Sequence, residues 1–151
     1  MIFRKASNLD LERIRKVVFD TLREYAIEPS PESTDKDLFD LEESYFRKNG
    51  YFEVCEDNGQ IVATWGILPL SLSACELRKM YLLKSHRGKG IGKTLLDRAL
   101  SKARELGFIR VELETASELK EAISMYEKRG FKLIENRSLS FRCDQAYELI
   151  L

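Results

Sequence analysis

A glycine-rich segment in the middle of the chain constrains the fold more than any other feature. The segment "HRGKGIGKTLL" (86–96) follows a predicted strand over 75–83 and opens a helical pattern over 90–106 that Gly107 ends. The pattern has one apolar stripe, formed by Ile91, Leu95, Leu96, Ala99, Leu100, Ala103 and Leu106. A strand that enters an amphipathic helix through a tight turn is typical of a β-α-β unit, so we expect an α/β protein.

The start of this helix also has the chemistry of an anion site. The first N–H groups of a helix have no partner within it, and the helix dipole adds positive potential there. Three glycines would allow close approach, and three basic residues add charge. These residues are Gly88, Gly90, Gly92, Arg87, Lys89 and Lys93. A diphosphate fits this chemistry; the alternative is a plain turn in which the glycines serve geometry and the basic residues serve solubility.

Two common phosphate loops do not match the segment. A P-loop requires glycine five residues before the Gly92-Lys93-Thr94 ending, and that position is Arg87. A dinucleotide fingerprint that begins at Gly88 requires its third glycine at position 93, which is lysine. Both nucleotide-binding classes are therefore excluded on spacing.

The rest of the pattern predicts a mixed sheet. The tight-turn pair Asn58-Gly59 joins two of the strands, and the predicted order is β-α-α-β-β-β-α-β-α-β-β. The strands are expected at 1–7, 51–56, 60–70, 75–83, 108–115, 131–143 and 144–151, and the helices near 11–25, 35–50, 90–106 and 117–130. Asn8 and Asp10 are candidate N-caps of the first helix. We expect a mixed, mostly antiparallel α/β (α+β) sheet of six to seven strands with about four helices, in one domain over 1–151.

Composition excludes several kinds of partner. The 25 Lys and Arg balance the 25 Asp and Glu, which argues against nucleic acid or an anionic membrane as a bulk partner. No stretch reaches the roughly 18 apolar residues that a membrane span requires. Three widely spaced cysteines and a single histidine argue against disulfides and against a metal site. We therefore expect a cytoplasmic protein without a metal.

Two stretches of the chain carry a resemblance to a known family. "RGKGIG" (87–92) resembles the Q/R-x-x-G-x-G/A signature of the GNAT superfamily of N-acetyltransferases. "AISMYEKRGF" (122–131) resembles the family's second diagnostic stretch, and Tyr126 lies 34 residues after Gly92 (126 − 92), a separation usual in the family. The element order agrees along nearly the whole chain. The resemblance implies a GNAT-like fold and an acyltransferase that uses acetyl-CoA as co-substrate.

The resemblance also implies where coenzyme A lies. The glycine-rich loop would hold its diphosphate, with Lys93 and Thr94 as secondary phosphate contacts. A β-bulge between Leu77 and Met80 would turn backbone N–H groups toward the pantetheine arm and the thioester carbonyl; the alternative is a regular strand that is buried on both faces. The implied cofactor-binding residues are Met80, Tyr81, Leu82, Arg87, Gly88, Lys89, Gly90, Ile91, Gly92, Lys93 and Thr94.

Two residues are candidates for catalysis. By resemblance, Tyr126 is the general acid for the leaving thiolate, and its alternative role is packing between helix and sheet. Glu76 is the candidate base that deprotonates the amine, directly or through water, and its alternative role is a strand carboxylate paired with Arg78. His86 is expected to be structural. Many family members have an asparagine that contacts the cofactor at the position where this chain has Leu119. The resemblance therefore implies no cofactor contact from this position.

The acceptor would lie near the first two predicted helices. The acids between Glu28 and Glu43 are interpreted mainly as a solvated helix face, with attraction of a cationic amine as the alternative. The function expected is transfer of an acetyl group from acetyl-CoA to a primary amine in a ternary complex. A small metabolite is favoured, a peptide or protein amine is allowed, and so is a homodimer. The alternative is a non-catalytic acyl-CoA-binding or regulatory module with the same fold.

Overall fold

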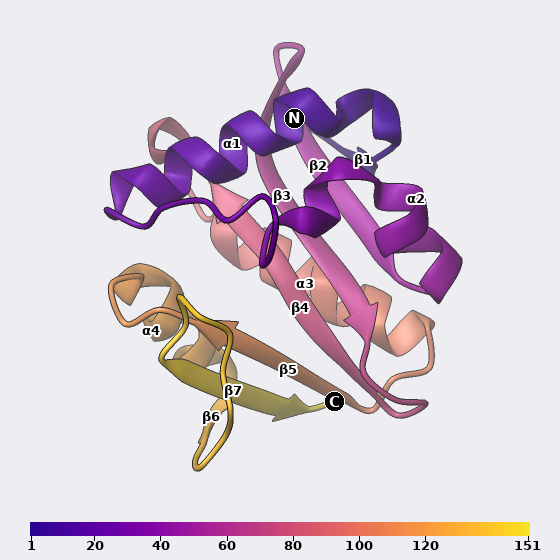
Figure 1. Ribbon diagram of the computed structural model, residues 1–151, viewed down its shortest axis with the longest axis vertical. Helices are drawn as coiled ribbons and strands as arrows, with labels where there is room; N and C mark the ends of the chain where they lie inside the picture. Colours follow the sequence, from indigo (N-terminus) through magenta and orange to yellow (C-terminus); the bar gives the residue numbers. More distant parts are fainter.

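Seven strands form one sheet in the order β1-β2-β3-β4-β5-β7-β6 in the computed structural model, which describes residues 1–151 (Figure 1). The strands are β1 (Ile2–Lys5), β2 (Tyr51–Asp57), β3 (Gln60–Pro69), β4 (Ala74–Leu82), β5 (Arg110–Thr115), β6 (Lys132–Ile134) and β7 (Gln145–Ile150). Every neighbouring pair is antiparallel except β4 and β5, which are parallel. The predicted mixed, mostly antiparallel sheet is confirmed.

Four α-helices cover the two faces of this sheet. They are α1 (Leu11–Glu24), α2 (Leu41–Ser44), α3 (Ile91–Glu105) and α4 (Lys120–Arg129). In Figure 1, α1 and α2 lie on one face, and α3 lies on the opposite face behind β3 and β4. Each face has its own apolar core, one centred on α1, α2 and β2, the other on α3 and the strands β3 to β5. The predicted element order is confirmed.

The element boundaries differ from the prediction in two places. The helix predicted over 35–50 is broken into two short 3-10 turns and the four-residue α2, because Asp40 is extended and its carboxylate accepts a hydrogen bond from the Glu43 N–H. The strand predicted over 131–143 ends at Ile134, and Asn136 then takes a left-handed conformation. Of the two predicted N-caps, Asp10 is the N-cap of α1, although its side chain makes no cap hydrogen bond there. Ser7 caps the 3-10 turn that precedes α1, and the Asp10 carboxylate completes that capping box.

The pairing of β4 with β5 is short. The two parallel strands are in register only at Ala74–Arg110, Cys75–Val111 and Glu76–Glu112. Beyond these pairs the strands diverge, and Figure 1 shows β5 turning away from β4 toward α4. The edge of β4 that follows Glu76 therefore has no strand partner on the β5 side, and an opening passes through the middle of the sheet.

A buried carboxylate joins the N-terminal strand to the first helix. Asp10 is 2% exposed and accepts hydrogen bonds from the Arg4 guanidinium at 2.9 and 2.8 Å, from Arg13 at 2.7 Å and from the Ser7 N–H at 2.9 Å. The hydrogen bonds from Arg4 are the largest cause that lowers the pKa of Asp10, to about 2 from an ordinary 3.8. The ionised carboxylate therefore stabilises the folded chain at neutral pH.

We expect Asp10→Asn to lower the free energy of unfolding by about 2 kcal/mol at pH 5.5, because it weakens charge-assisted hydrogen bonds but keeps an acceptor for Ser7. The folded-state pKa lies below the unfolded value, so this stabilisation is present above pH 4 and is lost as the pH falls toward 2. Urea unfolding at pH 5.5 and pH 2.5 measures this contribution. The difference in free energy of unfolding between wild type and variant should be smaller at pH 2.5. An equal difference at both pH values would show that the charge of Asp10 does not contribute.

Candidate active site

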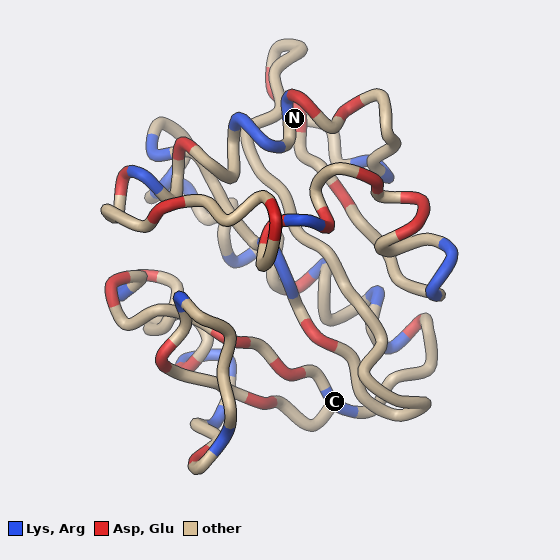
Figure 2. The backbone as a smooth tube through the Cα atoms, viewed as in Figure 1, with Lys and Arg blue, Asp and Glu red and all other residues tan.

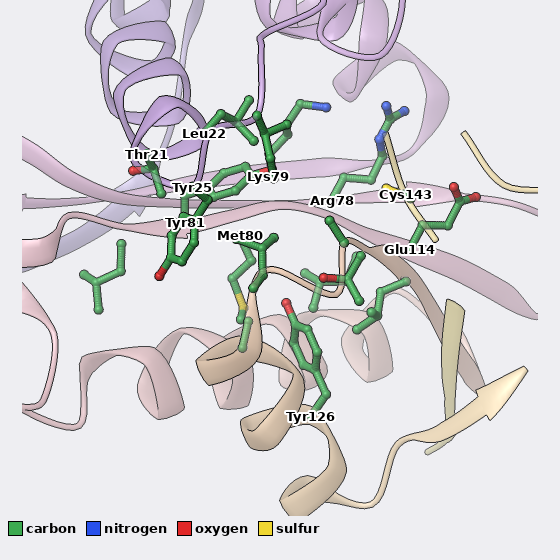
Figure 3. A pocket seen from close by; sticks show the side chains of 18 of the residues that line it. Thr21, Leu22, Tyr25, Arg78, Lys79, Met80, Tyr81, Glu114, Tyr126 and Cys143 are labelled. Atoms are coloured by element: carbon green, nitrogen blue, oxygen red, sulfur yellow. The ribbon is translucent and has the colours of Figure 1, made fainter. Parts of the chain in front are cut away.

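A cavity of about 570 Å³ occupies the opening where β4 and β5 diverge. Its walls come from α1, β4, β5, α4, the glycine-rich loop and the segment that connects β6 to β7 (Figure 3). Eight of the sequence-predicted site residues line it: Glu76, Met80, Tyr81, Leu82, Arg87, Gly88, Gly92 and Tyr126. The other five, Lys89, Gly90, Ile91, Lys93 and Thr94, lie outside its lining. The structure thus brings residues from distant parts of the chain to one space.

The strand that forms one wall contains the expected bulge. Gly66 of β3 is paired with Arg78, and Thr64 with Tyr81, so both Lys79 and Met80 lie opposite a single β3 residue. Lys79 has a φ of +53°, in the left-handed region that residues with a Cβ rarely adopt. The prediction of a bulge between Leu77 and Met80 is confirmed. It lies on the stretch of β4 that has no partner on the β5 side.

The glycine-rich loop has the backbone geometry that its sequence requires. Gly88 and Gly90 have φ values of +77° and +81°, and Gly90 is the N-cap of α3. No side chain caps this helix start, so its first N–H groups lack a side-chain partner. A Cβ at Gly92 would lie 3.5 Å from the Met125 sulfur, beside the cavity. The loop offers backbone donors at a helix N-terminus, where an anion is favoured.

Some of the other loop side chains are free to contact a ligand, and others already have partners in the protein. Lys89 and Lys93 are exposed and form no ion pair, so their charges are available to a ligand. The side chain of Ile91 is in the apolar core, and the Thr94 hydroxyl donates to the Gly90 carbonyl at 3.2 Å. Ile91 could therefore contact a ligand only through its backbone.

Arg87 departs from the expectation that its charge is free for phosphate. Its guanidinium forms a salt bridge with Glu24 at the end of α1 and donates to the Tyr25 hydroxyl at 3.1 Å. Its Nε donates to the Leu82 carbonyl at 3.0 Å, and Tyr25 in turn donates to Glu121 of α4 at 3.2 Å. The side chain of Arg87 thus ties the loop to α1, and its partners reach across to α4.

Tyr126 projects from α4 into the cavity. Figure 3 shows its hydroxyl pointing toward β4 near Met80, and it has no hydrogen-bond partner within the protein. Burial raises its pKa well above the ordinary value of 10, and the neighbouring phenol of Tyr81 adds to the shift. The phenol is therefore protonated throughout the physiological range, and its proton faces the cavity.

Glu76 lies in the opposite wall, on the last residue of β4 that pairs with β5. Burial is the largest cause that raises its pKa above 4.5; Arg78, with Nε 3.3 Å from the Glu76 Oε1, opposes the shift, and the charge of Glu114 adds to it. Glu76 therefore lines the cavity and also pairs with Arg78, the alternative considered for it. Glu114, which sequence reasoning missed, also lines the cavity and accepts from the Ser140 N–H and hydroxyl at 2.8 Å.

A cluster of buried charges closes the side of the cavity next to α1 and α2. Lys79 is 7% exposed, and its ammonium lies 3.4 Å from an Asp35 oxygen and 3.2 Å from an Asp37 oxygen. Arg142 pairs with both oxygens of Asp35, at 2.5 and 2.7 Å, and Tyr45 donates a hydrogen bond to Asp37. We call these five residues the charge cluster. It joins the α1–α2 connection, the β4 bulge and the β6–β7 connection.

The charge cluster corrects the interpretation of the acidic segment from Glu28 to Glu43. Five of its seven acids are exposed, as expected for a solvated face, but Asp35 and Asp37 are buried. Their partners lie 44 residues away at Lys79 and 107 residues away at Arg142. One local signal does exist, because a lysine in the middle of a strand requires a partner if that strand is buried.

Two further sequence expectations concern residues near the loop. The His86 ring bonds Asp57 and Ser85, each at 2.8 Å, and does not line the cavity, which supports a structural role. Leu119 lines the cavity at the N-cap of α4 and provides no side-chain cap. The chain contains no group of three or more His, Cys, Asp or Glu residues arranged to hold a metal ion, and none of its helices is both long and apolar enough to cross a bilayer.

We expect Arg142→Gln to lower the free energy of unfolding by about 3 kcal/mol, because it leaves the fully buried Asp35 without its bidentate partner. Arg129→Gln is the matched control, since it breaks an exposed pair with Asp97 and should cost less than about 1 kcal/mol. Urea unfolding of both variants at pH 7 measures the difference. Equal losses would mean that the Asp35–Arg142 pair is no stronger than a surface ion pair.

Comparison with known proteins places the chain in a family. Residues 16–131 match the acetyltransferase (GNAT) family. The chain is 38% identical over 139 residues to the uncharacterized N-acetyltransferase YjgM of Escherichia coli K12, covering 89% of this chain and 83% of that protein. It is 36% identical over 101 residues to the probable N-acetyltransferase family 8 member 5 of mouse, covering 64% of this chain and 44% of that protein.

Solved structures share the fold. A GNAT-family acetyltransferase of Staphylococcus aureus Mu50 superposes with a TM-score of 0.89 at 23% identity, over 97% of this chain and 96% of that one. An acetyltransferase of Streptococcus agalactiae superposes with a TM-score of 0.90 at 22% identity, over 99% and 98%. Together with the matched family and the curated relatives, these similarities show that the chain belongs to the GNAT family of acetyltransferases and is an acyltransferase enzyme.

Proposed function

We propose that the protein is an N-acetyltransferase that moves an acetyl group from acetyl-CoA to a primary amine by direct attack in a ternary complex. The observation that carries this proposal is the unpartnered Tyr126 phenol in a cavity formed where β4 and β5 diverge. The cavity reaches the glycine-rich loop at one end and the charge cluster at the other. A donor and an acceptor could therefore enter from different sides and meet beside Tyr126.

The residues present fit the binding of acetyl-CoA. The uncapped N-terminus of α3 and the exposed Lys89 and Lys93 would hold the diphosphate, with backbone N–H groups of Gly88 and Gly90 close to it. The unpaired edge of β4 at Met80, Tyr81 and Leu82 would hold the pantetheine arm, as an added strand would. When bound, acetyl-CoA supplies an activated acyl thioester. Similar folds support this: an acetyltransferase of Clostridium acetobutylicum is described with acetyl-CoA and one of Thermoplasma acidophilum with coenzyme A.

The walls of the cavity supply the groups that acyl transfer requires. The backbone N–H at the bulge, near Met80, would donate to the acyl carbonyl oxygen as negative charge develops on it. Tyr126 would donate its proton to the leaving sulfur. Burial raises the pKa of this phenol, so it still carries its proton when the sulfur leaves, and the same surroundings disfavour the thiolate and raise its affinity for that proton.

Glu76 would accept the proton that the attacking amine loses, directly or through a water molecule. Burial raises the pKa of this carboxyl, which makes its ionised form a stronger base. Arg78 holds the carboxylate in the cavity wall. Glu114 lies on the same wall, but the two hydrogen bonds from Ser140 already occupy one of its oxygens. We therefore assign the base to Glu76.

Other observations bear on the acceptor, the domain organisation and the cellular location. The volume of about 570 Å³, part of which the donor would occupy, favours a small amine, and a peptide or protein amine remains allowed. The single sheet supports one domain over 1–151, and the three free thiols support a cytoplasmic location. A homodimer is also allowed. The non-catalytic module considered as an alternative loses support, because the chain belongs to a family of acetyltransferases.

We expect Tyr126→Phe to lower kcat about 100-fold, because it removes the proton donor and leaves the ring in place. Tyr147→Phe is the control, since that buried phenol lies outside the cavity and bonds only the neighbouring Gln145. The assay is CoA release from acetyl-CoA with amines selected by thermal shift, alongside calorimetric titration of acetyl-CoA. A wild type that binds acetyl-CoA but releases no CoA with any amine would contradict the proposed function.

The base assignment predicts a pH dependence. Glu76 is active when ionised, and its pKa is raised, so kcat/KM should fall as the pH decreases through a value above 4.5. Glu76→Gln should be slower by about 100-fold and should lose this acidic limb. The matched variant Glu114→Gln should keep the limb. If Glu114→Gln removes it while Glu76→Gln retains it, then Glu114 is the base.

A further inference from the structure

The backbone of Lys79 adopts a conformation that its own side chain disfavours. Its φ of +53° lies in the left-handed region, where a Cβ crowds the following carbonyl. Glycine, or less often asparagine, is the usual residue there, and β-strands provide no local hydrogen bond that compensates for the strain. Something outside the backbone must therefore hold Lys79 in place.

The side chain of Lys79 is anchored at its far end. Its ammonium donates to the Thr34 carbonyl at 2.9 Å and lies 3.2 and 3.4 Å from oxygens of Asp37 and Asp35. Only 3% of the side chain is exposed. The two acids are themselves fixed, Asp35 by Arg142 and by the Ser30 N–H at 2.8 Å. The ammonium is therefore held by groups that cannot follow it if the bulge moves.

The carbonyl of Lys79 is anchored separately. The hydroxyl of Thr64, on the neighbouring strand β3, donates to it at 2.7 Å, and Thr64 is fully buried. This bond replaces the regular ladder contact that the bulge removes. Lys79 is thus fixed through both its side chain and its backbone, immediately before Met80.

We propose that Lys79 is a positioning residue: its ion pairs with Asp35 and Asp37, together with the Thr64 hydroxyl, hold the bulge in the shape that presents the next N–H group to the acyl carbonyl. The inference rests on the proposed function, since it assigns that N–H to catalysis. Lys79 acts on the backbone of Met80 and not on the amine. Its ammonium is already occupied by three oxygens, which leaves it no proton donor for a substrate.

A pair of substitutions separates this role from a direct electrostatic one. Lys79→Gly and Lys79→Ala remove the same ion pairs and leave the same acids unpaired, so these losses cancel in the comparison. Glycine accepts a φ of +53° and alanine does not. We expect kcat to be at least about five-fold higher in Lys79→Gly than in Lys79→Ala, both below wild type. At an ordinary strand site alanine would be the better replacement, so the sign of the difference is diagnostic.

A non-kinetic measurement accompanies the assay. The amide NMR signals of Met80 and Tyr81 should stay near their wild-type positions in Lys79→Gly and should shift or broaden in Lys79→Ala. Equal kcat values and equal spectra in the two variants would overturn the proposal. If wild type itself transfers no acetyl group, the proposed function fails, and the spectra still test whether Lys79 holds the bulge.

A second pair of substitutions, at Thr64, tests the proposal if the Lys79 variants do not fold. Thr64→Val removes the hydroxyl at nearly constant volume, and Thr64→Ser retains it. We expect Thr64→Val to lower kcat about three- to ten-fold, in line with the loss of one hydrogen bond, and Thr64→Ser to stay within two-fold of wild type. Wild-type kcat in a folded Thr64→Val variant would show that the bulge does not require this anchor, and would overturn the proposal.

Discussion

The structure depends on the short pairing of two parallel strands. β4 and β5 are in register over three residue pairs, from Ala74 to Glu76 on β4, and then diverge. A continuous ladder would bury the backbone groups of both strands and fill the middle of the sheet with side chains. Divergence instead leaves a β4 edge that can bond a ligand, and it creates the cavity into which α4 places Tyr126. The bulge at Lys79 and the first turn of α3 at Gly92 line this cavity.

The charge cluster adds little net free energy to the stability of the fold. Removing Lys79, Asp35 and Arg142 from water costs free energy that their mutual attraction only partly returns, and a well-packed apolar set would hold the fold at least as well. What an apolar set could not do is fix the direction of a single backbone segment, because dispersion contacts have no preferred direction. The cluster joins three segments that share no regular structure. Figure 2 marks the acidic and basic positions along the backbone of the chain. We therefore interpret the charge cluster as a set of contacts that fixes the direction of the backbone at the bulge.

The sequence predicted those parts of the site that depend on local physics. Gly88 and Gly90, singled out in the sequence because they allow close approach of an anion, have positive φ, and the three-residue offset between Leu77 and Met80 marked a real bulge. Prediction failed where a partner lies far along the chain. Nothing near Asp35 indicates Arg142, and nothing near Arg87 indicates the carboxylate of Glu24, which takes up its charge. The helix predicted over 35–50 failed for a local reason, since Asp40 is extended and its carboxylate accepts from the Glu43 N–H to begin a new turn.

Burial acts on the pKa of both groups that we propose for proton transfer. Burial disfavours the charged form of any acid, so it raises the pKa of Tyr126 and of Glu76 alike. For the phenol, the shift keeps the proton in place but makes Tyr126 a weaker acid, so the transfer requires that the same surroundings also disfavour the thiolate. For a carboxylate that must take a proton from an amine, the same shift increases basicity, and the charge of Arg78 opposes the shift. The cavity between the two diverging strands therefore shifts both pKa values upward, which strengthens Glu76 as a base and requires a matching shift in the thiol that Tyr126 would protonate.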